Sequence, residues 1–334
     1  MSNLGRNGRL LEWSFTKKVK RTTTGVCLIS LLLLGLADCG GQSEPVTLKI
    51  ALLPIMDTLP IYVAQEQGYF AEEGVVVEFV PVASAPDRDQ LIKAGQADGM
   101  VNELLSTMFY NSQQIEVSTV RYARKATAEF PHFSILAAAS SGITSPTDLA
   151  GREIGISEAT IIEYSTDRLL QAEGLSSAEI KTVAVPRIPD RLALLGSGEL
   201  VAANLPDPAS AVAALSGAIV VVDDSTYPEY GHSVITFRKE VIDEHPEAIR
   251  GFLNAIEKAV ADINNDKTKW NNLLSKNNLL PPPLMENYVI PDFPTAGLPD
   301  QAQWDDMLIW AQEKGYVSGD LAYADSVDAS YLPR

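Results

Sequence analysis

The chain has 334 residues, of which 46% are hydrophobic and 21% charged, and its formal net charge is −17. The apolar fraction excludes an intrinsically disordered chain, and the length suggests two domains of roughly 150 residues each. Such an acidic protein cannot bind nucleic acid by neutralising phosphates. Two cysteines and three scattered histidines exclude a disulfide-dense scaffold and provide too few ligands for a metal centre. We therefore expect no metal, no cofactor and no nucleic-acid partner.

Residues 1–38 have the pattern of a secretory signal peptide. Lys and Arg residues precede an apolar run over 25–37, which is shorter than the roughly 20 residues of a bilayer span. The run ends at Leu36-Ala37-Asp38-Cys39-Gly40. This segment resembles a bacterial lipoprotein cleavage site, with Asp38 where that pattern has a small residue. The resemblance implies a lipid, palmitate included, on Cys39 as the first mature residue, and residues 39–45 form a tether. We expect an anchor at the extracytoplasmic face of the cell membrane.

Beyond residue 45 the chain alternates predicted strands and helices. The predicted strands cover 46–53, 75–82, 97–101, 117–122, 133–139, 153–157, 180–185, 200–205, 218–222 and 232–237. The predicted helices cover 60–73, 87–94, 102–110, 160–173, 190–195, a long segment after Pro246, and 301–314. The long segment has an apolar stripe formed by Ile249, Phe252, Ile256, Val260 and Ile263. This alternation predicts an α/β fold with mostly parallel sheets.

Motifs for common enzyme chemistry are missing from the sequence. It contains no phosphate-binding loop, no Gly-x-Ser-x-Gly nucleophile elbow and no His-Glu-x-x-His zinc motif. His132, His232 and His245 lie at predicted turns or between strands, each without a second His or Cys at ligand spacing. We interpret all three as structural and predict that the protein is not an enzyme.

Four segments resemble a known family of binding proteins. The stretch LPIYVAQEQGYFAEEG at 59–74 is similar to the opening helix of the solute-binding proteins of nitrate, sulfonate and thiamine-precursor ABC importers. Residues 96–99, 145–156 and 205–208 resemble later segments of that family in the same order. The resemblance implies a type II periplasmic-binding-protein fold of two lobes with a two-strand hinge. Lobe one would be 46–131 plus 236–334, and lobe two 132–235. The implied partners are an ABC permease and its ATPase.

The candidate ligand-binding residues follow from the position of ligands in open α/β sheets. Such ligands lie beyond the carboxyl ends of strands and near helix N-termini. The residues at these places are Asp57, Thr58, Tyr62, Ser84, Asn102, Glu103, Ser157, Glu158, Thr160, Tyr164 and Asp207. An ordinary helix cap explains any single Ser, Thr or Asp among them equally well, and Tyr62 fits a core position too.

Acidic and aromatic candidates favour a neutral or amine-bearing heterocycle, with Tyr62 stacking on the ring and Asp207 accepting from an amine. Within the family this points to a vitamin-type ligand, either riboflavin or a thiamine-precursor pyrimidine. One alternative is an anion (aliphatic sulfonate, taurine or nitrate) held by backbone amides, with Arg121 or Arg187 reaching the cleft. A second is a pyrimidine-synthesis enzyme of the same fold, although such relatives use an active-site His and a cysteine-rich motif. A third is a purely structural surface lipoprotein.

Replacing Cys39 tests the predicted anchor. Cys39→Ser should fold normally but move from the membrane fraction to the medium, because a hydroxyl at this position cannot take the lipid. Cell fractionation followed by immunoblotting measures the distribution, and Cys27→Ser, within the apolar run, is the matched control. A Cys39→Ser protein that stayed in the membrane would show that the apolar run is an uncleaved anchor.

Overall fold

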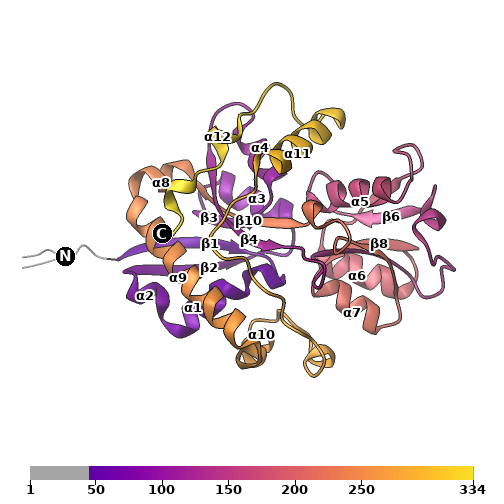
Figure 1. Ribbon diagram of the computed structural model, residues 1–334, viewed down its shortest axis with the longest axis horizontal. Coiled ribbons are helices and arrows are strands. Elements are labelled where there is room, and N and C mark those ends of the chain that lie inside the picture. Colours follow the sequence, from indigo (N-terminus) through magenta and orange to yellow (C-terminus); the bar gives the residue numbers. More distant parts are fainter. Residues whose placement is uncertain (1–44, 334) are drawn as a thin grey trace, which may run out of the picture. The chain divides into compact units, whose positions relative to one another are not determined.

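The computed structural model describes residues 45–333, so the predicted signal peptide and Cys39 lie outside the described residues. The described residues form one compact unit, in which the strands make two sheets of five (Figure 1). We call the part built on the first sheet lobe one and the part built on the second sheet lobe two. No helix within 45–333 combines the length and the apolar character that a bilayer crossing requires.

The first sheet has the strand order β2-β1-β3-β10-β4. Its strands are β1 (Val46–Leu52), β2 (Val75–Pro81), β3 (Gly99–Asn102), β4 (Val117–Lys125) and β10 (His232–Arg238). Strand β1 runs parallel to β2 and β3, whereas β10 is antiparallel to β3 and β4. The helices of this lobe are α1 (Leu59–Gln67), α2 (Tyr69–Glu72), α3 (Ala85–Lys93), α4 (Leu104–Asn111), α8 (Lys239–Glu244), α9 (Pro246–Asn265), α10 (Asn271–Lys276), α11 (Gln301–Glu313) and α12 (Tyr323–Ser326).

The second sheet repeats this connectivity in the order β7-β6-β8-β5-β9. Its strands are β5 (Phe133–Ala137), β6 (Glu153–Ile156), β7 (Lys181–Ala184), β8 (Ala202–Pro206) and β9 (Ile219–Asp223), with helices α5 (Ile161–Ala172), α6 (Ile188–Ser197) and α7 (Ala209–Leu215). Strand β6 is parallel to β7 and β8, and β5 is antiparallel to β8 and β9. The predicted α/β fold with mixed, mostly parallel sheets is therefore confirmed.

The chain passes between the two sheets twice. It leaves the first sheet after β4, enters the second at β5, and returns between β9 and β10. The second passage lies at 224–231, slightly before the predicted boundary after residue 235. The reason is that His232 already pairs with Lys125, so the whole of β10 belongs to the first sheet.

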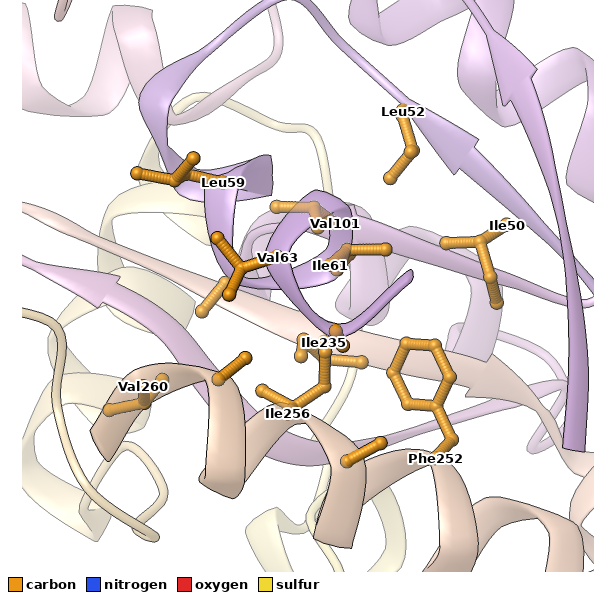
Figure 2. Close-up of a cluster of buried hydrophobic side chains, with 14 of the residues drawn as sticks. Ile50, Leu52, Leu59, Ile61, Val63, Val101, Ile235, Phe252, Ile256 and Val260 are labelled. Carbon is orange, nitrogen blue, oxygen red and sulfur yellow. The ribbon is translucent and has the colours of Figure 1, made fainter. Parts of the chain in front are cut away.

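The core of lobe one lies between its sheet and the pair α1 and α9. Figure 2 shows Ile50 and Ile235 from the strands, Ile61 from α1, and Phe252 and Ile256 from α9 gathered in this layer. The predicted apolar stripe of α9 is confirmed, because its five residues are at most 1% exposed. The predicted helix over 60–73 is instead two helices, since Gly68 adopts a left-handed φ of 78° that ends α1 and precedes α2.

Helices cover both faces of each sheet. In lobe one, α3 and α4 pack on the face opposite α1 and α9. In lobe two, α5 covers one face and α6 and α7 the other, as Figure 1 shows. The short helix α7 is absent from the sequence-based prediction. Parallel strands covered on both faces explain the near-continuous apolar runs in the sequence.

Helix α11 bridges the two lobes. It packs against α4 of lobe one, and its residues Trp304 and Trp310 share a hydrophobic cluster with α5 of lobe two. The indole Nε1 of Trp310 donates to Asp167 Oδ2 at 2.9 Å, and Lys314 Nζ lies 2.7 Å from the same oxygen. Tyr164 of α5 donates to Asp306 Oδ2 at 2.6 Å. The lobes are therefore joined by α11 as well as by the two chain passages.

Replacing Asp167 tests the contribution of this bridge. Asp167→Ala should lower the free energy of unfolding by about 1–3 kcal/mol, because it leaves the buried indole N–H of Trp310 without an acceptor. Urea denaturation followed by fluorescence measures the change. The exposed Asp305→Ala on α11 is the control, and an equal, small effect of both variants would contradict a structural role for the Asp167 contacts.

Candidate ligand-binding site

A buried cleft lies between the two lobes. It contains about 530 Å³ of space free of atoms, part of it open to solvent. Apolar side chains form much of its wall: Leu53, Ile55, Ala85, Val101, Phe133, Ile161, Ile162, Pro186, Ile188 and Pro206. The polar side chains in the wall are Asp57, Arg88, Asn102, Glu103, His132, Ser157, Thr160, Arg191 and Ser233. A mostly apolar cleft with a few polar groups is typical of a small-molecule site.

Strand ends and helix starts place these polar residues. Asp57 follows β1, Asn102 ends β3 and Glu103 is the N-cap of α4. Ser157 follows β6, and Thr160 caps α5, where its Oγ1 accepts from Ile162 N at 3.2 Å. These five predicted residues come together in one cleft, as expected for the carboxyl edges of two open sheets.

In lobe one, Arg88 is paired with acidic neighbours. Its Nε lies 2.8 Å from Asp89 Oδ1, and its Nη1 lies 3.2 Å from Glu103 Oε2 and donates to the carbonyl of Val101 at 3.2 Å. Burial raises the pKa of Glu103, and the charge of Arg88 offsets part of this rise. Burial alone would lower the pKa of Arg88, but the charges of Asp89 and Glu103 raise it overall. The positive charge of Arg88 is thus already balanced.

Asp57 connects the cleft with the passages between the lobes. Its Oδ1 lies 2.7 Å from His132 Nε2 and accepts from the hydroxyl of Ser233, and its Oδ2 lies 4.0 Å from Arg124 Nη1. Burial would raise the pKa of Asp57, but His132, Arg124 and Ser233 together lower it to about 2. Asp57 is therefore a buried carboxylate with charged and hydrogen-bonded neighbours.

Several buried polar atoms of the cleft residues make no hydrogen bond within the described part of the chain. They are Asp57 Oδ2, Arg88 Nη2, Asn102 Oδ1, Glu103 Oε1, His132 Nδ1 and Ser157 Oγ. An unpaired buried polar group costs about 1–3 kcal/mol, and most buried groups have a partner. Such a concentration of them in one cleft indicates a place where a ligand supplies the missing partners.

Three other predicted residues do not line this cleft because their side chains have different contacts. Tyr62 packs edge-on against Phe79 with ring centroids 4.9 Å apart, and burial raises its pKa. Thr58 donates to the carbonyl of Ile55 at 2.8 Å. Ser84 caps α3 by accepting from Asp87 N at 3.2 Å. The aromatic ring that does line the cleft is that of Phe133, not Tyr62.

The remaining three predicted residues lie on lobe two, outside the cleft. Glu158 is exposed, and Tyr164 is held by Asp306 of α11. The carboxylate of Asp207 pairs with Arg124 Nη1 at 2.8 Å and accepts from the hydroxyl of Tyr288. Asp207 thus lines a different pocket, on which Tyr288 also borders. The sequence could not show that the carboxylate of Asp207 is already bound by Arg124 and Tyr288.

Four polar residues line the cleft without having been predicted from the sequence: Arg88, His132, Arg191 and Ser233. The two arginines suggested for an anionic ligand do not line it, because Arg121 pairs with Glu257 at 2.7 Å and Arg187 is exposed beside Asp190. Arg187 is the N-cap that precedes α6, whereas Arg191 lies within the helix and is fully buried. His132 and Ser233 each flank a passage between the lobes, which was the available signal for them.

The chain belongs to the NMT1/THI5-like family, whose family model matches residues 55–269, the region that holds every polar residue of the cleft wall. A protein named 4-amino-5-hydroxymethyl-2-methylpyrimidine phosphate synthase from Uromyces fabae is 28% identical over 127 residues, which are 37% of this chain and 36% of that protein. The chain thus spans little more than a third of the length of the curated relatives that it matches.

Solved structures of binding proteins share the fold. The alkanesulfonate-binding protein SsuA from Xanthomonas axonopodis pv. citri, bound to MOPS, has a TM-score of 0.72 at 16% identity, covering 85% of this chain and 99% of SsuA. The periplasmic nitrate-binding protein NrtA from Synechocystis PCC 6803 has a TM-score of 0.66 at 14% identity, covering 85% of this chain and 86% of NrtA. The fold is accordingly the two-lobed type II periplasmic-binding-protein fold.

Buried His232, on the strand that returns to lobe one, should make stability depend on pH. Burial, followed by the charges of His132 and Lys125, lowers the pKa of His232 to about 4 from 6.5. Between these values the unfolded chain binds the proton and the folded protein does not, so stability falls as the pH falls. Between pH 7 and pH 5 the loss due to His232 is about 2 kcal/mol.

The variant His232→Gln should therefore lose less stability than the parent protein between pH 7 and pH 5. Urea denaturation at both pH values measures the difference, and His245→Gln, at an exposed position, is the control. An unchanged pH dependence in His232→Gln would contradict the assignment of a buried neutral imidazole.

Proposed function

We propose that the protein is the solute-binding component of an ABC importer, which captures a small molecule between its lobes and delivers it to a permease driven by an ATPase. The observation that carries this proposal is the buried cleft between the lobes with several unpartnered polar atoms. Family membership and the fold shared with SsuA and NrtA support it. Closure of two lobes on a ligand would bury it and supply those atoms with partners.

The proposed ligand is a small amine-bearing heterocycle of vitamin type. The unpartnered atoms of Asp57, Asn102 and Glu103 are hydrogen-bond acceptors, which suit the N–H groups of an aminated ring. The ring of Phe133 and the apolar wall suit its flat faces. Within this class we propose a single aminopyrimidine ring rather than riboflavin. The synthase relative is named after a compound of this pyrimidine kind.

An anionic ligand is the second candidate, and one observation favours it. Arg191 lines the cleft without a carboxylate partner among the described residues. SsuA and NrtA are named as alkanesulfonate- and nitrate-binding proteins. Isothermal titration with thiamine-precursor pyrimidines, riboflavin, taurine and nitrate compares the two candidates directly.

Catalysis is the remaining candidate, supported by the partial match to the pyrimidine phosphate synthase. The chain has only Cys27 and Cys39, both outside the described residues. In the cleft, His132 Nε2 is already held by Asp57 at 2.7 Å. We propose binding without turnover. Incubating the protein with each candidate ligand and finding a changed product by mass spectrometry would overturn this part of the proposal.

The proposed location is the extracytoplasmic face of the membrane, with lipid on Cys39 as the anchor. A purely structural lipoprotein would have the same location but no ligand. A thermal-shift screen separates the two, because a ligand at about 100 times its Kd adds about 2.7 kcal/mol of stability. A screen in which no small molecule raises the Tm would favour the structural role.

Replacing Glu103 tests the heterocycle against the anion. Glu103→Gln should weaken binding of an aminopyrimidine by about tenfold or more, because it removes a charge-assisted hydrogen bond. An anionic ligand such as nitrate should bind more tightly to this variant, since a nearby negative charge is removed. Isothermal titration measures both affinities, and Glu158→Gln at an exposed position is the control. Tighter nitrate binding without pyrimidine binding would contradict the heterocycle.

A further inference from the structure

Within the part of the chain that the structure describes, Arg191 differs from the other fully buried arginines in having no acidic partner. Arg88, Arg121 and Arg124 each lie within 3.2 Å of a carboxylate oxygen of Glu103, Glu257 and Asp207, respectively. Arg191 is also 0% exposed, yet no carboxylate pairs with it within the described residues. Burial alone lowers its pKa to about 10. At neutral pH the cleft wall therefore contains a buried guanidinium with which none of the described carboxylates is paired.

Hydrogen bonds hold the Arg191 guanidinium in one orientation. Its Nε donates to the carbonyl of Asn204 at 2.8 Å, and its Nη1 donates to the carbonyls of Val185 at 2.6 Å and Pro186 at 3.3 Å. Its Nη2 makes no hydrogen bond within the described part of the chain. The side-chain amide of Asn204 is in turn anchored to α5 through the Ile162 carbonyl at 3.1 Å. With Nε and Nη1 held by carbonyl groups, Nη2 is the nitrogen that can donate to an acceptor on a bound ligand.

Two further donors of lobe two lie in the same cleft wall. The hydroxyl of Ser157 is buried and makes no hydrogen bond within the described residues. Thr160 caps α5, a helix of 12 residues whose positive end favours an anion. Part of this helix end is already satisfied, because Ile162 N donates to Thr160 Oγ1 and the first-turn carboxylate of Glu163 accepts from Ala159 N at 2.7 Å. Among the described residues, the part of the cleft wall that belongs to lobe two contains no acidic side chain.

Lobe one presents the opposite chemistry. Its cation Arg88 is balanced by Asp89 and Glu103, and the atoms of this lobe without partners include carboxylate and amide oxygens of Asp57, Asn102 and Glu103. Arg88 Nη2 is a donor without a partner on lobe one as well, but two carboxylates balance the charge of that side chain. The two ends of the cleft therefore differ in charge, with mostly acceptor oxygens on lobe one and an unbalanced guanidinium on lobe two.

We propose that the ligand carries both an amine or ring N–H group, bound by the acceptors of lobe one, and an anionic group, bound by Arg191 and Ser157 of lobe two. This inference rests on the proposed binding function and narrows its ligand class. In this inference the heterocycle and the anion are two parts of the same ligand, the heterocycle bound by lobe one and the anionic group by lobe two. A phosphorylated or otherwise acidic aminopyrimidine satisfies both ends, whereas nitrate or an uncharged pyrimidine satisfies only one.

Matched probes with and without the anionic group test the inference. The first pair is 4-amino-5-hydroxymethyl-2-methylpyrimidine and its phosphate, and the second is ethanolamine and taurine. Isothermal titration of the full mature chain should show at least tenfold tighter binding of the anionic member in at least one pair. Ser157→Ala, which removes a hydroxyl without protein partners, should reduce this preference severalfold and leave folding unchanged.

Variants of Arg191 test the charge itself. Arg191→Met should abolish the preference for the anionic member, and Arg191→Lys should restore part of it, with circular dichroism confirming that each variant is folded. Arg187→Met, at the exposed neighbouring arginine, is the control and should keep the full preference. If Arg191→Met does not fold, the effect of Ser157→Ala on the preference for the anionic member decides whether the inference holds.

The outcomes separate this inference from the function on which it rests. Equal binding of the charged and uncharged members, or a preference that survives in Ser157→Ala and in folded Arg191→Met, would overturn the two-ended ligand and leave the binding function intact. The absence of binding in both pairs and in a wider thermal-shift screen would instead reject the binding function itself.

Discussion

The chain crosses between the lobes twice, and one buried carboxylate holds both crossings together. Asp224 accepts from the backbone N–H groups of His132 at 2.7 Å and Phe133 at 3.0 Å, which fixes the first crossing. On the second crossing, Gly231 lies so close that a Cβ there would be 1.9 Å from Asp224 Oδ2. Burial raises the pKa of Asp224 to about 6, although His132 and the two N–H groups act against this shift. Only glycine fits this approach, so the hinge depends on this pair of residues.

This arrangement links the cleft to the hinge. The backbone that Asp224 holds belongs to His132 and Phe133, whose side chains line the cleft, and His132 contacts Asp57 at the end of β1. A ligand that bonds to Asp57 would therefore act directly on the contact between the two lobes. Helix α11 joins the lobes at a second place through Asp167 and Asp306. Any opening of the lobes must either preserve these α11 contacts or break buried hydrogen bonds.

The α/β class could be predicted from local patterns, the two-lobed arrangement only from the resemblance to a known family, and the site only in part. Alternating apolar strands and capped helices mark the elements, because buried parallel strands and amphipathic helices leave clear periodicities. The rule for strand ends found Asp57, Asn102, Glu103, Ser157 and Thr160, which depend only on local position. The same rule could not show which of the other candidates form hydrogen bonds or ion pairs with residues far away in the sequence. Tyr164 is held outside the cleft by Asp306 of α11, and Asp207 by Tyr288, each more than 80 positions away along the chain.

The two sheets have the same connectivity but different charges at their edges, and our proposal for the ligand rests on this difference. In lobe one, the carboxylates of Asp89 and Glu103 neutralise Arg88, so the atoms without partners are mainly oxygens. In lobe two, backbone carbonyls take the place of carboxylates around Arg191 and leave its full charge uncompensated. A buried charge without a partner is costly to maintain. On our proposal a ligand supplies the counter-charge when the lobes close, and the hydroxyl of Ser157 in the same cleft wall, which makes no hydrogen bond among the described residues, adds a donor.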